Sequence, residues 1–337
     1  MLDSKSETKL YDIAKCITTI LVVVAHSTRM YTSKGVFTPL NTSNFLTSLT
    51  TYIYSFHMPL FIFLSGIIYA YSISNGKYTN TLNFIKQKAK RLLIPYLAFG
   101  LFWVAPIMCL LGLSEQSYTT YCITKIIMAT DARHLWYLLA LFNIFLIAIV
   151  TKPLIMSSQK IYRILLFLLS LLLFFASRYI KTAHFQLCNA LYYQLFFFIG
   201  VFFHLYYKTL IVLFKKIFPV FIVTPFILIG IFKYNPNLLS RIIYSIIGII
   251  MILALSVFII QRCEKLTTTP LYKYIHTNSF GIYLFHPMII YILYFYLGQY
   301  DIPPIILCFD IAIISIVFSI IATKLFRVLR LKIFIGE

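Results

Sequence analysis

The chain has 337 residues, of which 61% are hydrophobic and only 11% charged, and its mean hydropathy is +0.90. A water-soluble fold with so little charged surface would aggregate, so this composition excludes a soluble globular protein and indicates a chain that uses lipid as its solvent. The formal net charge of +20 would suggest nucleic-acid binding in a soluble protein, but its distribution along the chain indicates a membrane topology instead.

Ten apolar stretches are long enough to cross a bilayer, which takes about 20 residues in a helix. The first contains Lys15, and no small-residue cleavage site follows before Arg29, so we expect a retained helix and not a signal peptide. The pattern predicts an all-α, polytopic integral membrane protein with one membrane-embedded domain over 1–337. The predicted helices are roughly 13–31, 52–73, 92–113, 135–151, 162–177, 187–207, 217–233, 241–261, 279–298 and 302–323.

Lysine and arginine alternate between the two ends of these helices. Of the 29 such residues, 21 lie in the terminal segments and in every second loop, against 8 in the other loops. Because cytoplasmic segments carry the excess of positive charge, both termini are predicted to be cytoplasmic. Topology thus accounts for most of the charge, and we expect no nucleic-acid partner.

The first predicted helix carries two ionisable residues, Lys15 and His26, eleven residues apart. Eleven residues turn an α-helix by about 1100°, so the two side chains point within about 20° of one direction, about 16 Å apart along the axis. Lys15 is placed at the cytoplasmic end, and His26 beyond the midplane. Ionisable groups inside a membrane cost about 2.5–3.5 kcal/mol each, which makes them functional candidates. Two other interpretations stay open: Lys15 extends to the headgroups, and His26 bonds a neighbouring helix.

The second and third helices also carry polar groups. In "YSFHMPLFIFLSGIIYAY", His57 and Pro59 are expected to open the second helix at the outer face, and Ser65-Gly66 by itself indicates close helix packing. In "KQKAKRLLIPY", basic residues crowd the cytoplasmic end of the third helix. This cluster fits a membrane anchor, a headgroup contact or a polyphosphate site, and composition alone favours the anchor. Its members are Lys86, Lys88, Lys90 and Arg91.

Two further stretches contain titratable residues. In "DARHLWYLLALF", Asp131 and His134 are three residues apart at the outer face, and they become neighbours if the helix starts early. In "SFGIYLFHPMII", His286 precedes Pro287 in the middle of a span. Asp310 is the one acidic residue well inside a predicted span. It lies on the next helix at similar depth, and a contact with His286 would lower the cost of burying both.

Five stretches together resemble the membrane acyltransferase-3 superfamily, which acylates cell-surface sugars in bacteria. They are Asp12-x2-Lys15-x10-His26, "FHMPLFIFLSG", "KRLLIPY", "HLWYL" and "SFGIYLFHP", in the expected order over residues 11 to about 290. They are most similar to the fucose 4-O-acetylase-like and capsular polysaccharide O-acetyltransferase branch. Many relatives have arginine at the position of Lys15. The lysine of this chain keeps the positive charge but cannot make the bidentate hydrogen bonds of arginine.

This resemblance implies which residues form the site. His26, the histidine of the x10 spacing, is then the catalytic residue, acting as general base on a sugar hydroxyl or accepting the acyl group itself. His134, with Asp131, is the second catalytic candidate, positioning the acceptor or orienting His26. The implied donor is a cytoplasmic acyl-CoA, with acetyl-CoA expected. The residues implied to bind its phosphates are Lys15, Lys88 and Arg91, and those expected to line the pocket are Asp12, His57, Ser65, His286 and Asp310.

The implied activity is that of an O-acyltransferase of the bacterial plasma membrane, acting on a surface or capsular polysaccharide or its lipid-linked precursor. Membrane lipid is a further expected partner, and a homo-oligomer is left open. The six cysteines form no C-x-x-C pair, so no metal is expected. An O-succinyltransferase of the same fold is one alternative. A polysaccharide-precursor transporter or flippase is another, although the sequence shows neither inverted repeats nor helices broken at the midplane. A scaffold protein, in which His26 would be dispensable, is the third.

Overall fold

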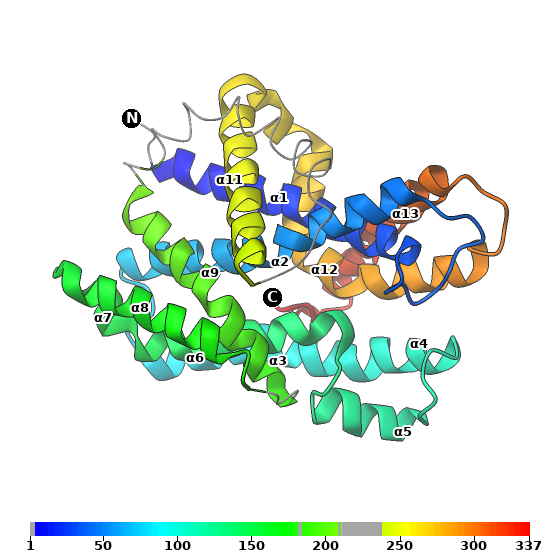
Figure 1. Ribbon diagram of the computed structural model, residues 1–337, viewed down its shortest axis with the longest axis horizontal. Coiled ribbons are helices and arrows are strands. Elements are labelled where there is room, and N and C mark those ends of the chain that lie inside the picture. The colour runs from blue at the N-terminus through cyan, green and yellow to red at the C-terminus, as the bar shows by residue number, and fades with distance from the viewer. Residues whose placement is uncertain (1–3, 181–183, 208–209, 211–237) are drawn as a thin grey trace. The chain divides into compact units, whose positions relative to one another are not determined.

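The computed structural model describes residues 4–180, 184–207, 210 and 238–337, and all regular secondary structure within them is helical (Figure 1). Eight segments of this part are long and apolar enough to cross a membrane, so the chain is an all-α, polytopic membrane protein. Nine of the ten predicted spans correspond to helices, and the remaining one, 217–233, lies outside the described residues. The main helices are α1 (Ser4–Thr28), α2 (Asn44–Ser74), α3 (Thr81–Phe99), α6 (Trp136–Val150), α8 (Lys160–Ala176), α9 (Leu187–Leu205), α11 (Leu238–Arg262), α12 (Pro270–Leu297) and α13 (Pro304–Val328).

The helices α2, α3 and α12 begin roughly eight to eleven residues before the spans that hydropathy predicts. Polar N-caps mark two of these starts. The Asn80 side chain accepts a hydrogen bond from the Asn83 N–H at 3.0 Å, and the Thr269 hydroxyl accepts one from the Tyr272 N–H at 3.3 Å. Hydropathy detects the part of a helix inside the hydrocarbon, whereas the cap marks where the helix starts. His57, predicted to open the second helix, therefore lies well inside α2.

Packing divides the chain into two compact units. Unit 1 consists of Met1–Phe61 and Tyr206–Leu325, and unit 2 of Ile62–Leu205 and Phe326–Glu337. The helices α2 and α13 each contribute residues to both units. One domain over 1–337 therefore stays a prediction.

In unit 1, α1 and α12 pack side by side along their lengths. Near their N-terminal ends, His276 Nε2 lies 3.0 Å from Asp12 Oδ1. Near their C-terminal ends, the Tyr294 hydroxyl donates to the Ser27 carbonyl at 3.1 Å. The two helices therefore run parallel. Two spans that run parallel are separated along the chain by an odd number of other spans. Seven predicted spans lie between the two that correspond to α1 and α12, which meets this condition.

The loop after α1 is joined to the loop between α12 and α13. The Leu40 N–H donates to the Gly298 carbonyl at 2.9 Å, and the Asn41 side chain donates to the Asp301 carboxylate at 2.8 Å. The two loops thus lie at the same end of unit 1, as the charge pattern predicts for two outer loops.

A proline inside α2 is accommodated by a side chain of α11. Pro59 has no N–H for the carbonyl of Ser55, four residues earlier. The Ser245 hydroxyl donates to that carbonyl at 2.8 Å. Because backbone polar groups in a membrane must be satisfied within the protein, this contact allows the proline to lie inside a buried helix.

In unit 2, α2 and α9 approach each other at two glycines. A Cβ atom at Gly66 would overlap the carbonyl oxygen of Phe197, and one at Gly200 would overlap that of Phe63. Membrane helices pack this closely where small residues remove the steric barrier. The structure thus gives Gly66 the packing role that its sequence context indicates.

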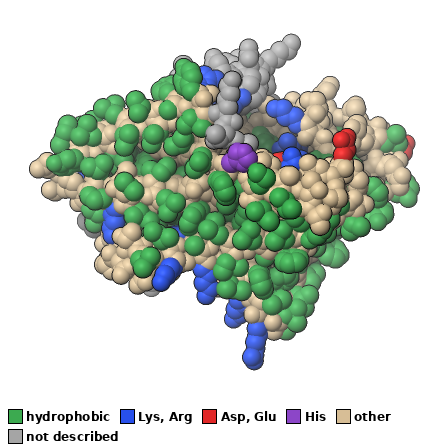
Figure 2. Space-filling model, turned by 90° about the horizontal axis from the view of Figure 1, so that it is seen from below, with side chains coloured by type: hydrophobic (Ala, Val, Ile, Leu, Met, Phe, Trp, Pro, Cys, Tyr) green, Lys and Arg blue, Asp and Glu red, His purple; other side chains and the backbone are tan. Residues whose placement is uncertain are grey.

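Large apolar side chains cover much of the surface seen in Figure 2. On α8 they recur at helical spacing and are exposed, which in water would favour aggregation and in a bilayer forms a lipid-facing surface. These residues are Ile161, Ile164, Leu165, Leu168, Leu172 and Phe175.

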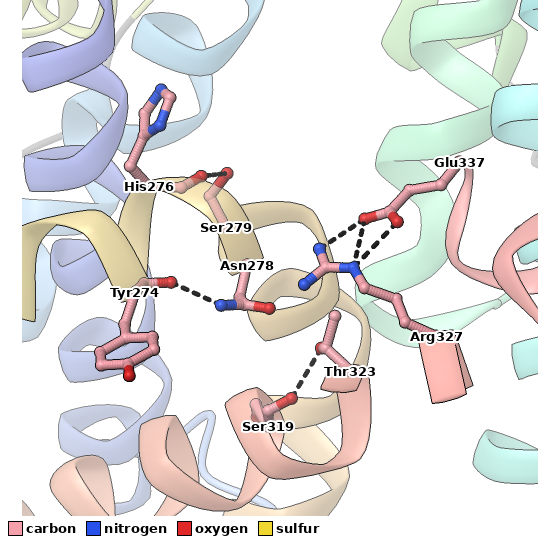
Figure 3. A network of polar contacts seen from close by, with 8 residues as sticks. All are labelled: Tyr274, His276, Asn278, Ser279, Ser319, Thr323, Arg327 and Glu337. Carbon is pink, nitrogen blue, oxygen red and sulfur yellow. Dashed lines mark hydrogen bonds and ion pairs between the residues drawn. The ribbon is translucent and has the colours of Figure 1, made fainter. Parts of the chain in front are cut away.

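An ion pair in unit 2 joins the end of α13 to the segment that follows it (Figure 3). The Arg327 guanidinium donates to Glu337 through Nε at 2.9 Å and through Nη2 at 2.5 Å. This hydrogen bonding holds the pKa of the Glu337 carboxyl below its usual value. A carboxyl with a lowered pKa stabilises the fold above its ordinary pKa of about 4.3, and that stabilisation is lost as the pH falls through the folded-state value.

We expect Glu337→Gln to lower the free energy of unfolding at pH 7 by up to about 1 kcal/mol, because the pair is partly exposed and screened by solvent. The difference from wild type should disappear in acid, where Glu337 is protonated in both states. Thermal unfolding of the detergent-solubilised proteins at pH 7 and at a series of lower pH values measures both effects. Equal stability at pH 7 would mean that the pair contributes nothing.

Candidate active site

His26 lies in the last turn of α1, and this helix is unbroken from Ser4 to Thr28. Lys15 is on the same helix, so the two side chains share one face with about 16 Å between them along the axis. Both are partly exposed. Partial exposure leaves the His26 imidazole accessible to a substrate.

Rings from two other helices of unit 1 pack against His26. The His286 ring on α12 lies 5.1 Å away between centroids, with its plane turned by 74°. The Tyr54 ring on α2 lies at 6.1 Å and in turn contacts the His57 ring edge-on at 4.7 Å. We call these four residues, His26, Tyr54, His57 and His286, the histidine cluster.

The two inner histidines of the cluster are anchored to the backbone. His57 Nδ1 lies 2.8 Å from the Ile53 carbonyl oxygen, and His286 Nδ1 lies 2.7 Å from that of Ile282. Because a carbonyl oxygen only accepts, each Nδ1 carries the proton, and a neutral ring presents Nε2 as an acceptor. Both side chains are buried, with exposed fractions of 2% and 0%. Of these two rings of defined tautomer, His286 packs directly against the accessible imidazole of His26, and His57 packs against Tyr54.

This arrangement suits proton transfer or nucleophilic attack at His26. A general base needs an accessible nitrogen and a ring whose position is held by its neighbours. A nucleophilic imidazole needs the same two properties. Among the predicted site residues of unit 1, His26, His57 and His286 are brought together.

Asp310 does not join the histidine cluster. It is exposed, whereas His286 is fully buried. The buried residues around it, Leu307, Cys308 and Ile311, define the face of α13 that packs inside unit 1, and Asp310 points away from that face. The predicted contact between His286 and Asp310 is therefore absent, and His286 packs against His26 instead.

The other residues predicted to line a pocket have partners of their own. Asp12, at the opposite end of α1 from His26, pairs with His276, whose ring stacks on Tyr272 at 5.9 Å. In unit 2, the hydroxyls of Ser65 and Tyr137 lie 3.4 Å apart. The pair of Asp12 and His276 was not foreseen, because hydropathy places His276 before the start of its helix.

Lys88 and Arg91, predicted to bind acyl-CoA phosphates, lie on α3 in unit 2. The Lys88 ammonium is 4.3 Å from the Phe145 ring centroid, 5.2 Å from that of Tyr78 and 5.3 Å from that of Phe84. Three rings around one ammonium form a cation–π site that holds the side chain in place. Arg91 is exposed. Phosphate binding stays a prediction for both residues.

Asp131 pairs with Arg133 and not with His134. Its carboxylate accepts a hydrogen bond from the Arg133 N–H at 3.2 Å and lies 3.9 Å from the guanidinium. His134 is buried in the short 3₁₀ turn that precedes α6. The α-helix begins only at Trp136, so the helical spacing on which the predicted pairing depends does not exist here. The catalytic roles of the two residues stay predictions.

A family model described as an acyltransferase domain, that of the acyltransferase-3 family, matches residues 9–324. The chain belongs to the acyltransferase-3 family. No curated protein and no solved structure matches it. The protein is thus a multi-pass membrane acyltransferase, and its place in the fucose 4-O-acetylase-like and capsular branch stays a prediction.

Two neighbours of His26 in this acyltransferase were not among the predicted site residues. Tyr54 belongs to the histidine cluster, and the Arg29 guanidinium donates to the Tyr54 hydroxyl through Nη1 at 3.3 Å. Arg29 follows His26 by three residues, which is the spacing of neighbours on a helix and is the signal that could have identified it. Tyr54 carries no such signal, because aromatic residues are common in membrane helices.

Proposed function

We propose that this acyltransferase transfers an acyl group, with acetyl expected, from cytoplasmic acyl-CoA to a sugar hydroxyl. The acceptor in this proposal is a surface or capsular polysaccharide, or its lipid-linked precursor, at the bacterial plasma membrane. The observation that supports it best is the accessible His26 imidazole, which packs against the buried, anchored ring of His286. Lys15, about 16 Å away on the same helix face, supplies a positive charge at the cytoplasmic end.

In the proposed reaction, His26 removes the proton from the sugar hydroxyl. The oxygen then attacks the thioester carbonyl carbon, a C–O bond forms, the C–S bond breaks, and the CoA sulfur takes up a proton. In the alternative course, His26 attacks the thioester first and passes its acyl group to the sugar. Either course needs the ring of His26 to keep its position, and His286 is the residue that we expect to maintain it.

We expect His286→Asn to reduce kcat for acyl transfer by about 100-fold while leaving the KM for acyl-CoA unchanged. The asparagine amide can still donate to the Ile282 carbonyl, but it no longer supplies a ring against His26. The pH profile of kcat should shift, because the neighbour of the titrating imidazole has changed. The exposed histidine of unit 2, His184, provides the matched control as His184→Asn. An unchanged kcat and pH profile for His286→Asn would remove His286 from the mechanism.

The proposed function is tested with membrane vesicles that contain the wild-type chain and glycan acceptor. They receive acetyl-CoA or succinyl-CoA labelled in the acyl group, and base-labile label on glycan is measured. Label from acetyl-CoA supports the proposal, and label from succinyl-CoA alone identifies the O-succinyltransferase. If His26→Ala abolishes glycan export and no label appears with wild type, the result favours the transporter alternative and the proposal is wrong.

A further inference from the structure

A buried tyrosine of α12 holds the end of α1. Ser27, the residue directly after His26, lies in the last turn of α1 and is fully buried. The Tyr294 hydroxyl donates to the Ser27 carbonyl at 3.1 Å and lies 3.3 Å from the Ser27 hydroxyl. Carbonyls at the end of a helix lack intrahelical donors, and inside a membrane no water replaces those donors. Tyr294 therefore supplies a donor to the end of α1 from a neighbouring helix.

A second helix, α13, is attached to the same end of α1. The Ser27 hydroxyl donates to the Cys308 carbonyl at 2.7 Å. Tyr31, four residues after Ser27, donates through its hydroxyl to the Pro304 carbonyl at 3.2 Å. The Tyr31 ring packs edge-on against that of Tyr294, with 6.2 Å between centroids. Tyr294 thus contacts both of the residues through which the end of α1 is bonded to α13.

These bonds affect His26 through the backbone. The Cα atoms of consecutive residues are about 3.8 Å apart and are joined by a planar peptide, so a fixed Ser27 leaves the Cα atom of His26 little freedom. The ring of His286 supports the imidazole, whereas Tyr294 fixes the turn that carries it. A misplacement of about 1 Å can slow an enzyme by about 10²-fold. The hydroxyl of Tyr294 is therefore expected to affect the rate of transfer.

We propose that Tyr294 is a positioning residue for His26. Its hydroxyl fixes the last turn of α1, so that the imidazole meets the thioester and the sugar hydroxyl in the geometry that transfer requires. Tyr294 acts through Ser27 and neither touches the reacting atoms nor transfers a proton. This inference rests on the proposed function, because His26 is taken as the reaction centre. It adds a residue that lies outside the histidine cluster and outside the stretches that resemble the family.

The test compares two substitutions that each remove one buried hydroxyl and keep the ring. Tyr294→Phe removes the bond to Ser27. Tyr69→Phe is the matched control, because Tyr69 of unit 2 is equally buried and donates to the Ala148 carbonyl, in the last turn of α6, also at 3.1 Å. Both variants should lower the unfolding midpoint in detergent by a similar amount, since each takes one donor from a carbonyl near a helix end. Only Tyr294→Phe should lower kcat for acyl transfer, by roughly 10- to 100-fold, with the KM for acyl-CoA unchanged.

A double variant tests whether Tyr294 acts through His26. In the His26→Ala protein, Tyr294→Phe should change the residual rate by less than about twofold, because the group that it positions is already gone. An unchanged kcat in Tyr294→Phe, an equal loss of kcat in Tyr69→Phe, or the full loss again in the double variant would each overturn the inference.

The wild type and His26→Ala, measured beside these variants, separate this inference from the proposed function. If the wild type transfers label and His26→Ala does not, the proposed function stands and only the role of Tyr294 fails. If the wild type transfers no label, or His26→Ala keeps the wild-type rate, the reaction centre itself is wrong and the inference fails with it.

Discussion

Replacing His26 by alanine is expected to lower the rate of acyl transfer by about 10²–10⁴-fold, the usual contribution of a positioned general base. The variant removes the only partly exposed histidine of the histidine cluster and leaves the buried ring of His286 without its neighbour. Transfer of labelled acyl groups to glycan in membrane vesicles, normalised to the amount of folded protein, measures the loss. Added imidazole should restore part of the rate, because it can occupy the space left by the side chain.

His184→Ala is the control for this experiment. His184 is exposed, bonds the Met128 carbonyl through Nδ1 at 3.2 Å and lies in unit 2, outside the histidine cluster. Its variant should transfer acyl groups at the wild-type rate. If His26→Ala also keeps the wild-type rate, His26 is a structural histidine and the central assignment is wrong.

Replacing Gly66 by alanine is expected to cause a clear loss of stability in unit 2. The new Cβ would overlap the carbonyl oxygen of Phe197, and Gly200 makes the reciprocal close approach to the carbonyl oxygen of Phe63, so the two helix backbones would have to separate to admit it. Overpacking costs about 1–3 kcal/mol, and the upper end applies where the obstacle is backbone and cannot rotate away. Thermal unfolding of the detergent-solubilised variant measures the loss.

Gly100→Ala provides the matched control in the same unit. Its new Cβ would meet the side chain of Ile126, which can change rotamer, so the expected loss is smaller. The double variant of Gly66 and Gly200 should lose less stability than the sum of the two single variants, because one separation of α2 from α9 relieves both overlaps. A Gly66→Ala protein as stable as wild type would show that the helices are not in close contact at this point.

The sequence by itself determined that the chain lies in lipid, that its fold is all-α, and that Lys15 and His26 share one face of a helix. Hydropathy summed over about 20 residues and the 3.6-residue helical repeat are local properties, so they can be read without knowing which helices are neighbours. Helix starts needed more than hydropathy. The caps at Asn80 and Thr269 extend α3 and α12 beyond the apolar runs, and the same effect placed His57 inside α2.

Only the tertiary structure decided which titratable side chains meet. Asp310 was paired with His286 by depth alone, but the rotation of α13 turns it away and leaves His286 beside His26. Asp131 was paired with His134 by a helical spacing that the chain does not adopt there. The physical reason is that a membrane helix is apolar on nearly all its faces. Its sequence therefore gives the depth of a polar residue but not the neighbour that the residue faces, and that neighbour is set by packing between helices.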